Sequence, residues 1–150
     1  MKKLEIAWRI LFIAASIDLI LGLGTLLYEP SSIILARELG MKEFTGLTPE
    51  ELRTLSPNLF PWIGFVFKSW GAFIIGSSIL TMGIAATAYR KGERWSWFTL
   101  LIGHVPTCLI YLAISILLQS AYLLLIGLAV LPYLVGLFLP TREFLRGGKL

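Results

Sequence analysis

Charge is scarce in this sequence. Only 15% of its 150 residues are Asp, Glu, Lys or Arg, whereas 57% are hydrophobic and the mean hydropathy is +0.81. A soluble domain carries about a quarter charged residues, so this composition argues against a soluble globular protein. The net charge of +4 does not indicate a nucleic-acid partner, because the basic residues lie beside long apolar runs.

Cysteine and histidine are each present only once, as Cys108 and His104. A single cysteine excludes an intrachain disulfide. A single histidine excludes a bis-histidine haem or a histidine cluster for a metal ion within one chain. Gly22-Leu23-Gly24 is only a fragment of a nucleotide-binding fingerprint and lies in an apolar run, so it carries no prediction. We therefore expect no cofactor and no metal, and the residues leave open whether any catalysis occurs.

Four apolar runs lie between the charged segments, and each approaches the ~20 residues that cross a ~30 Å hydrocarbon core. They predict an all-α membrane protein with a single domain, a bundle of four transmembrane helices at residues 6–27, 60–88, 95–118 and 121–139. The first run is too long for the apolar part of a signal peptide, and no small-x-small cleavage site follows it. We therefore expect it to be a retained helix.

Residues 28–59 form the only long connection between the predicted spans. A short helix is predicted from Pro30 to Leu39. Thr48-Pro49-Glu50-Glu51 predicts the start of a second short helix, with threonine as N-cap, proline at the first helical position and acids in the first turn. Both segments have apolar faces, so we expect amphipathic helices at the membrane interface.

The distribution of Lys and Arg predicts the orientation. Three such residues lie in the long loop, alongside five acids, whereas nine lie at the two termini and between the second and third spans. The positive-inside rule therefore places both termini in the cytoplasm and residues 28–59 outside. The nine basic residues are Lys2, Lys3, Arg9, Arg90, Lys91, Arg94, Arg142, Arg146 and Lys149.

Asp18, Lys68 and His104 are ionisable residues inside the predicted spans, where a charge costs at least ~2.5–3.5 kcal/mol. Helical spacing places each one on a stripe of small and polar residues, the kind of face that packs against other helices. All three are therefore expected to point into the bundle. The stripes are Ala14, Ala15, Asp18, Gly22 and Thr25; Lys68, Ala72, Gly76, Gly83 and Thr87; and His104, Thr107, Cys108, Tyr111 and Ser115.

Depth in the bilayer predicts which of these groups meet. At ~1.5 Å per residue, Asp18 falls near the bilayer centre, His104 ~4 Å toward the cytoplasm and Lys68 ~9 Å toward the outside. Asp18 and His104 are thus the expected direct pair, and Lys68 either joins them or extends to the outer surface. Pro106 cannot donate a hydrogen bond to the carbonyl of Ile102. The residues predict a polar notch at this depth.

The candidate ligand site consists of Asp18, Lys68, His104, Thr107 and Tyr111. One interpretation is functional, a ligand pocket or a proton relay centred on Asp18 and His104. The other is structural: such contacts hold helices in register and are individually modest, ~0.6 kcal/mol on average. The pattern favours the structural interpretation and leaves the functional one open.

The second predicted helix ends in Ala88-Tyr89-Arg90-Lys91-Gly92-Glu93-Arg94-Trp95, and a proline-containing third helix follows. Together with the chain's size and its helix-bearing loop, this resembles the DoxX-like group of small four-helix membrane proteins. The resemblance implies a four-helix fold and an association with respiratory or quinone-linked complexes, and it transfers no catalytic residue. Small multidrug resistance transporters also carry a carboxylate in their first helix, where Asp18 would be the counterpart. They have Glu there and lack the long loop.

The expected function is therefore non-enzymatic, either an accessory subunit of a membrane complex or a binder of a lipid-like or quinone-like molecule. The alternatives are a small proton-coupled transporter, or a lipid-modifying enzyme that uses Asp18 and His104 as acid and base. The expected partners are membrane lipids; a larger membrane complex, a homo-oligomer and a hydrophobic ligand stay open. The expected location is the cell membrane.

Overall fold

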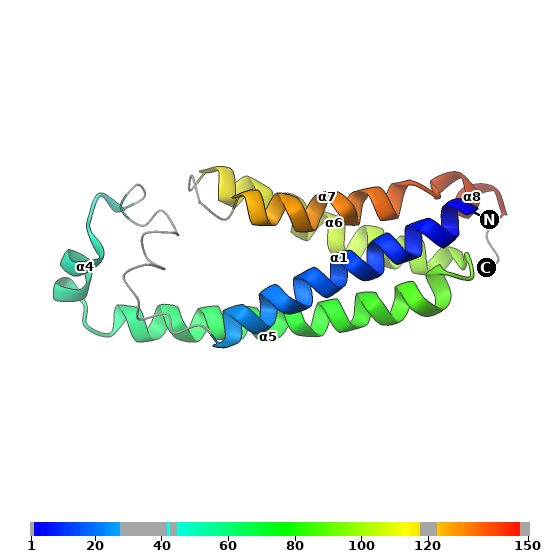
Figure 1. Cartoon of the computed structure of the whole chain (residues 1–150). Coiled ribbons are helices and arrows are strands. Elements are labelled where there is room, and N and C mark those ends of the chain that lie inside the picture. The colour runs from blue at the N-terminus through cyan, green and yellow to red at the C-terminus, as the bar shows by residue number, and fades with distance from the viewer. Residues whose placement is uncertain (1, 28–41, 43–44, 118–122, 148–150) are drawn as a thin grey trace.

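The computed structural model describes residues 2–27, 42, 45–117 and 123–147, and within them the chain is helical without strands. The helices form an elongated bundle, with α4 beyond one end of it (Figure 1). The elements are α1 (Lys2–Leu27), α4 (Pro49–Leu55), α5 (Leu59–Ile84), the π-helical segment η1 (Ala85–Tyr89), α6 (Arg94–Leu117), α7 (Leu123–Phe138) and α8 (Thr141–Gly147).

Three helices are long and apolar enough to cross a membrane: Lys2–Leu27, Pro61–Tyr89 and Arg94–Ile114. They lie within a few residues of the first three predicted spans, because the apolar runs that carried the prediction also determine where the helices lie. The residues of the fourth predicted span form α7, an apolar helix of 16 residues that is shorter than these three. A further helix, α8, follows Pro140 and was not predicted from the sequence.

The short helix predicted at Thr48 is confirmed as α4 (Pro49–Leu55). Thr48 accepts a hydrogen bond from the Glu51 backbone N–H at 3.3 Å, and the Glu51 carboxylate accepts one from the Thr48 backbone N–H at 2.7 Å. The backbone N–H of Thr48 holds the pKa of Glu51 below its usual value. The other predicted short helix, Pro30 to Leu39, lies outside the described residues.

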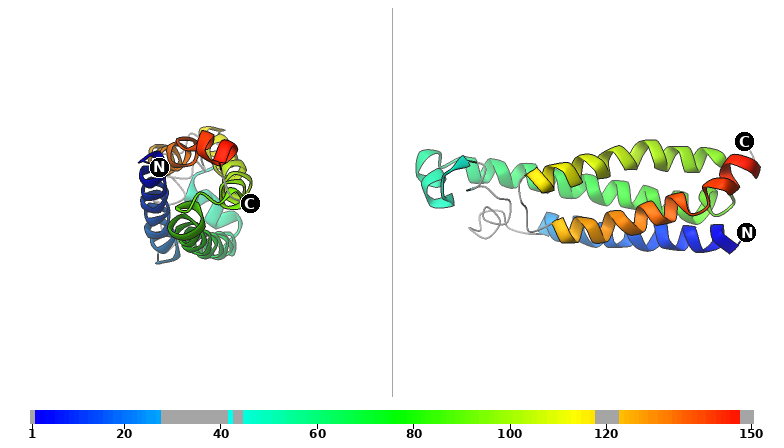
Figure 2. Two further views of the ribbon diagram at one scale, coloured as in Figure 1. Left: turned by 90° about the vertical axis from the view of Figure 1, so that its right-hand side faces the viewer. Right: turned by 90° about the horizontal axis from the view of Figure 1, so that it is seen from above.

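The four long helices surround a common axis, and α1 lies between α5 and α7 (Figure 2). Helix α1 packs along α5 and against α7, whereas α6 packs against α7 and η1. Glycine allows the closest approach of α1 to α5: a Cβ added to Gly71 would lie 3.0 Å from both the Gly22 carbonyl oxygen and the Leu26 nitrogen. The bundle is therefore assembled around α1.

The prediction of which face of α5 points into the bundle is wrong. Lys68, Ala72, Gly76, Gly83 and Thr87 are all exposed, and the buried face carries Gly64, Gly71, Ser78, Thr81 and Ala85 instead. Small residues occur on both sides of this helix, and the prediction of the buried side depended on the position of Lys68 alone. The packing of α5 against α1 needs the glycine at position 71, so Lys68 faces away from the bundle.

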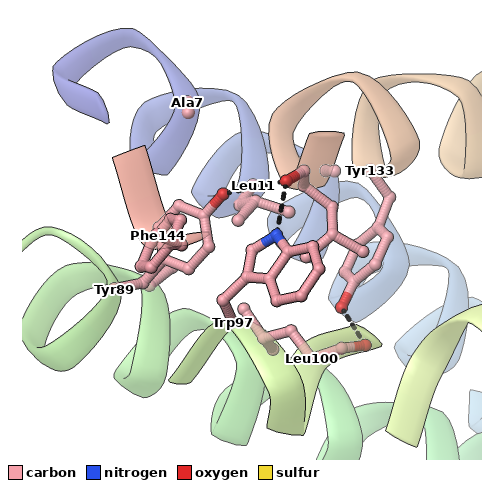
Figure 3. Packing of buried hydrophobic residues seen from close by; sticks show 10 residues of the cluster. Ala7, Leu11, Tyr89, Trp97, Leu100, Tyr133 and Phe144 are labelled. Carbon is pink, nitrogen blue, oxygen red and sulfur yellow. Dashed lines mark hydrogen bonds between the residues drawn. The ribbon is translucent and has the colours of Figure 1, made fainter. Parts of the chain in front are cut away.

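The core lies at the end of the bundle where α1 begins, and it joins α1, η1, α6, α7 and α8 (Figure 3). Two of its aromatic members donate hydrogen bonds to the last turn of α7. The hydroxyl of Tyr89 donates to the Gly136 carbonyl at 2.8 Å, and the indole N–H of Trp97 donates to the Leu137 carbonyl at 3.0 Å. Gly136 needs such a donor because Pro140, four residues later, has no N–H.

Candidate functional site

Asp18 and His104 meet inside the bundle, as the sequence led us to expect. Asp18 lies on the face of α1 that carries the buried Ala14, Ala15 and Gly22, so the predicted stripe on this helix is confirmed. The Oδ2 atom of Asp18 lies 3.8 Å from Nε2 of His104 on α6. The side chains are 22% and 21% exposed, respectively. The pair therefore joins α1 to α6, and each side chain is partly exposed.

The separation of these two groups is chemically important. A distance of 3.8 Å is longer than a hydrogen bond between nitrogen and oxygen. The carboxylate oxygens and the imidazole nitrogen consequently retain hydrogen-bonding capacity. In a hydrocarbon environment, unused capacity of this kind costs several kcal/mol per group unless water or another molecule satisfies it.

Tyr133 is the member of the site that sequence reasoning missed. It lies on α7, its ring stacks on the His104 imidazole with centroids 4.1 Å apart and planes 29° apart, and it is 1% exposed. Its hydroxyl donates to the Leu100 carbonyl at 3.2 Å, which fixes the ring (Figure 3). A hydroxyl-bearing aromatic directly after Pro132, inside an apolar run, was the available signal. Tyr133 fixes the plane of the imidazole.

The remaining predicted site residues are not all gathered here. Lys68 is exposed on α5, away from the bundle interior. Thr107 is half-buried on α6, and its hydroxyl donates to the Gly103 carbonyl at 3.4 Å, within its own helix. Tyr111 belongs to α6, and its side chain lies outside the described part of the structure. The structure therefore joins Asp18 and His104, and adds Tyr133 to them.

Packed core residues close the site at the end of the bundle where α1 begins, and we call them its floor. The buried residues that α1 contributes to the core are Ala7, Leu11 and Ala14, all on the N-terminal side of Asp18. Helix α6 contributes Trp97 and Leu100, both on the N-terminal side of His104. Since both helices begin at the same end of the bundle, the packed core separates the pair from that end (Figure 1).

The chemistry available is that of one carboxylate, one imidazole and one buried thiol, Cys108, one helical turn beyond His104. Within the described residues, no group of three or more His, Cys, Asp or Glu side chains is arranged to hold a metal ion. An imidazole beside a carboxylate can donate a hydrogen bond to one polar atom of a guest and accept one from another. The arrangement suits recognition of a small polar group.

Comparisons of the chain with protein-family models, with curated proteins and with solved structures find no match.

Proposed function

We propose that this protein spans the membrane four times and binds the polar head of a lipid-like or quinone-like molecule between Asp18 and His104. The observation that carries the proposal is the 3.8 Å gap between Oδ2 and Nε2, with about a fifth of each side chain open. The two groups lie within ion-pair distance but beyond hydrogen-bond distance, so both keep hydrogen-bonding capacity that a third partner can use.

The closed floor determines the side from which a guest would enter. Transport by alternating access would require this floor to open in a second state. The floor side holds Leu11, Tyr89, Trp97, Leu100 and Tyr133, all buried. A guest would therefore enter from the far end of the bundle or from the lipid, with its polar head against the pair and its apolar part among hydrophobic side chains.

The free donor and acceptor atoms of Asp18 and His104 determine which polar group a guest must carry. Nε2 of His104 and the Asp18 carboxylate can together hold a group that both donates and accepts a hydrogen bond, such as a hydroxyl, or a carbonyl next to one. A quinone-like ring can also stack on the face of the His104 imidazole that Tyr133 does not cover. The proposed four-span topology is consistent with the resemblance of the chain to the DoxX-like group.

The test uses decylubiquinol as the probe, because its hydroxyl groups both donate and accept hydrogen bonds. It is added to the full-length protein in detergent without oxygen, with quenching of tryptophan fluorescence as the readout. We expect saturable quenching, weakened about tenfold in Asp18→Asn and in His104→Gln, since a hydrogen bond to a charged group contributes ~1.5–3 kcal/mol. Lys68→Gln is the matched control, because Lys68 is an ionisable residue of the same spans that faces away from the site.

Thermal unfolding of the same variants separates this proposal from a purely structural role. Non-saturable quenching of the wild-type protein, together with a lowered Tm in Asp18→Asn and His104→Gln, would mean that the pair holds α1 to α6 and binds nothing. Equal weakening in Lys68→Gln would locate the quenching outside the bundle and would also contradict the proposal.

A further inference from the structure

Two arginines from distant parts of the chain lie around Trp8, close to where α1 begins. The guanidinium carbon of Arg90 lies 5.0 Å from the centre of the Trp8 ring, and that of Arg9 lies 5.6 Å from it. Both also approach the Glu5 carboxylate: Arg9 Nη2 lies 2.8 Å from Oε1, and Arg90 Nε lies 3.9 Å from Oε2. The contacts bring two cationic groups together at a single point of the surface.

Most of the hydrogen-bonding capacity of these arginines is free. A guanidinium carries five N–H donors, and Arg9 donates one to Glu5. The distance from Arg90 to Glu5 describes an ion pair that is longer than a hydrogen bond. The two side chains are 64% and 55% exposed. With Glu5 included, the cluster keeps a net charge of +1 and presents its donors outward.

An apolar hollow of about 500 Å³ adjoins these charges on the outer side of α1 and is lined by Trp8, Arg9, Phe12 and Ile13. Ile13 is 58% exposed, and the Trp8 and Phe12 rings meet edge to face, with centroids 6.5 Å apart. The hollow runs from Arg9 toward the middle of α1, a helix that is long and apolar enough to cross a membrane. Its surroundings are therefore lipid.

We propose that Arg9 and Arg90, held around Trp8, bind the phosphate of an anionic phospholipid, with one acyl chain lying along Phe12 and Ile13. The occupant follows from the combination of contacts. Guanidinium groups bind phosphate through paired N–H donors, and a tryptophan at this depth marks the membrane–water boundary. A soluble anion would use the charges and leave the apolar hollow empty. A zwitterionic lipid would fill the hollow and bring a cation toward two arginines.

This inference rests on membrane insertion and on the surface of α1, and it is independent of any ligand between Asp18 and His104. Each site can be occupied or empty without the other. Arg9 and Glu5 belong to one helix, whereas Arg90 follows η1. A bound lipid would thus add a connection between the start of α1 and the turn between η1 and α6, which already meet through Trp8 and Glu5.

The experiment is native mass spectrometry of the full-length protein in detergent with equimolar phosphatidylglycerol and phosphatidylcholine of the same chain length. We expect the wild-type protein to retain phosphatidylglycerol preferentially, and Arg9→Gln/Arg90→Gln to lose about tenfold of that preference, because each basic group near an anionic surface contributes to attraction. The matched control is Lys3→Gln/Arg142→Gln, which removes two exposed charges from the same end of the bundle without touching Trp8.

Three results would overturn the proposal. The wild-type protein could show no preference for phosphatidylglycerol. The control pair could lose as much preference as the arginine pair, which would mean attraction by the whole basic end. Finally, glycerol 3-phosphate at the lipid's concentration could displace the phospholipid, which would identify a site for a soluble anion. Tm measurements on both double variants check that they remain folded, and we expect little change since exposed ion pairs contribute little.

Discussion

At the scale of single residues, glycines determine how closely α5 and α7 can approach α1. A Cβ added to Gly136 on α7 would lie 2.8 Å from the Cγ atom of Leu11 and 3.1 Å from the Ala7 carbonyl oxygen. Gly76, on the outer side of α5, would meet nothing within 4 Å. Close backbone contact of this kind is the means by which helices associate in lipid, where burial of apolar surface supplies little driving force.

We therefore predict that Gly136→Leu destabilises the protein, whereas Gly76→Leu does not. The larger side chain at position 136 must push α7 away from α1, and forced overpacking costs typically ~1–3 kcal/mol. The measurement is thermal unfolding in detergent, with Gly76→Leu as the matched glycine-to-leucine control in another long helix. A comparable loss of stability in Gly76→Leu would show that the outer side of α5 is packed, for instance in a homo-oligomer.

At the scale of elements, the last turn of α7 depends on side chains from its neighbours. The Gly136 carbonyl has no N–H donor of its own helix, because the residue four positions later is Pro140. Tyr89 supplies that donor from η1 at 2.8 Å. Arg94 does the same for α8, donating from Nε to the Phe144 carbonyl at 2.8 Å and from Nη2 to the Leu145 carbonyl at 2.7 Å. These contacts attach both C-terminal helices to the turn between η1 and α6.

We predict that Tyr89→Phe lowers the stability of the protein by ~1–3 kcal/mol, since a buried carbonyl is left without a donor. We expect a lower Tm and faster amide hydrogen exchange near the junction of α7 and α8. Tyr133→Phe is the control, because Leu100, which accepts its hydroxyl, lies in the middle of α6 and has a helical donor in His104. Equal losses in the two variants would contradict the special role of the proline-freed carbonyl.

The positions of the long helices and of α4 were predictable from the sequence, α8 was not, and the packing faces were predictable only in part. Apolar runs of membrane-spanning length locate the helices, and Thr48-Pro49-Glu50-Glu51 locates the start of α4, because each signal is local in sequence. Which side of α5 meets α1 depends on a contact between Gly71 and Gly22, residues far apart in the chain. Helical spacing alone offered two stripes of small residues, and only the partner helix distinguishes them.

The candidate site shows the same division between local and distant information. Asp18 and His104 could be paired from sequence because each is an isolated ionisable group whose depth follows from counting residues. Tyr133 could not be placed beside them, since its stacking on His104 depends on how α7 lies against α6. A tyrosine hydroxyl in an apolar helix is also cheaper to bury than a charge, so it attracts less attention in a sequence.

At the scale of the whole molecule, most of the described basic residues lie at one end of the folded bundle. The start of α1, the turn between η1 and α6, and α8 all lie at the same end of the bundle (Figure 1). Among the described residues this end carries Lys2, Lys3, Arg9, Arg90, Lys91, Arg94 and Arg142. The positive-inside rule then supports the proposed four spans and our prediction that both termini are cytoplasmic, which requires α7 to cross the membrane despite its 16 residues.

Single-cysteine labelling tests that topology directly. In a Cys108→Ser background, we expect an impermeant maleimide to label Thr54→Cys on intact cells, and to label Lys91→Cys and Arg142→Cys only after permeabilisation. All three positions are exposed, so differences in labelling report the side of the membrane. The Arg142 position distinguishes four spans from three. If α7 failed to cross, Arg142→Cys would react together with Thr54→Cys, and the proposed topology would be wrong even with Lys91→Cys protected. Because α8 lies beside the η1–α6 turn and is held there by Arg94, such a result would also require these hydrogen bonds to be broken in the membrane.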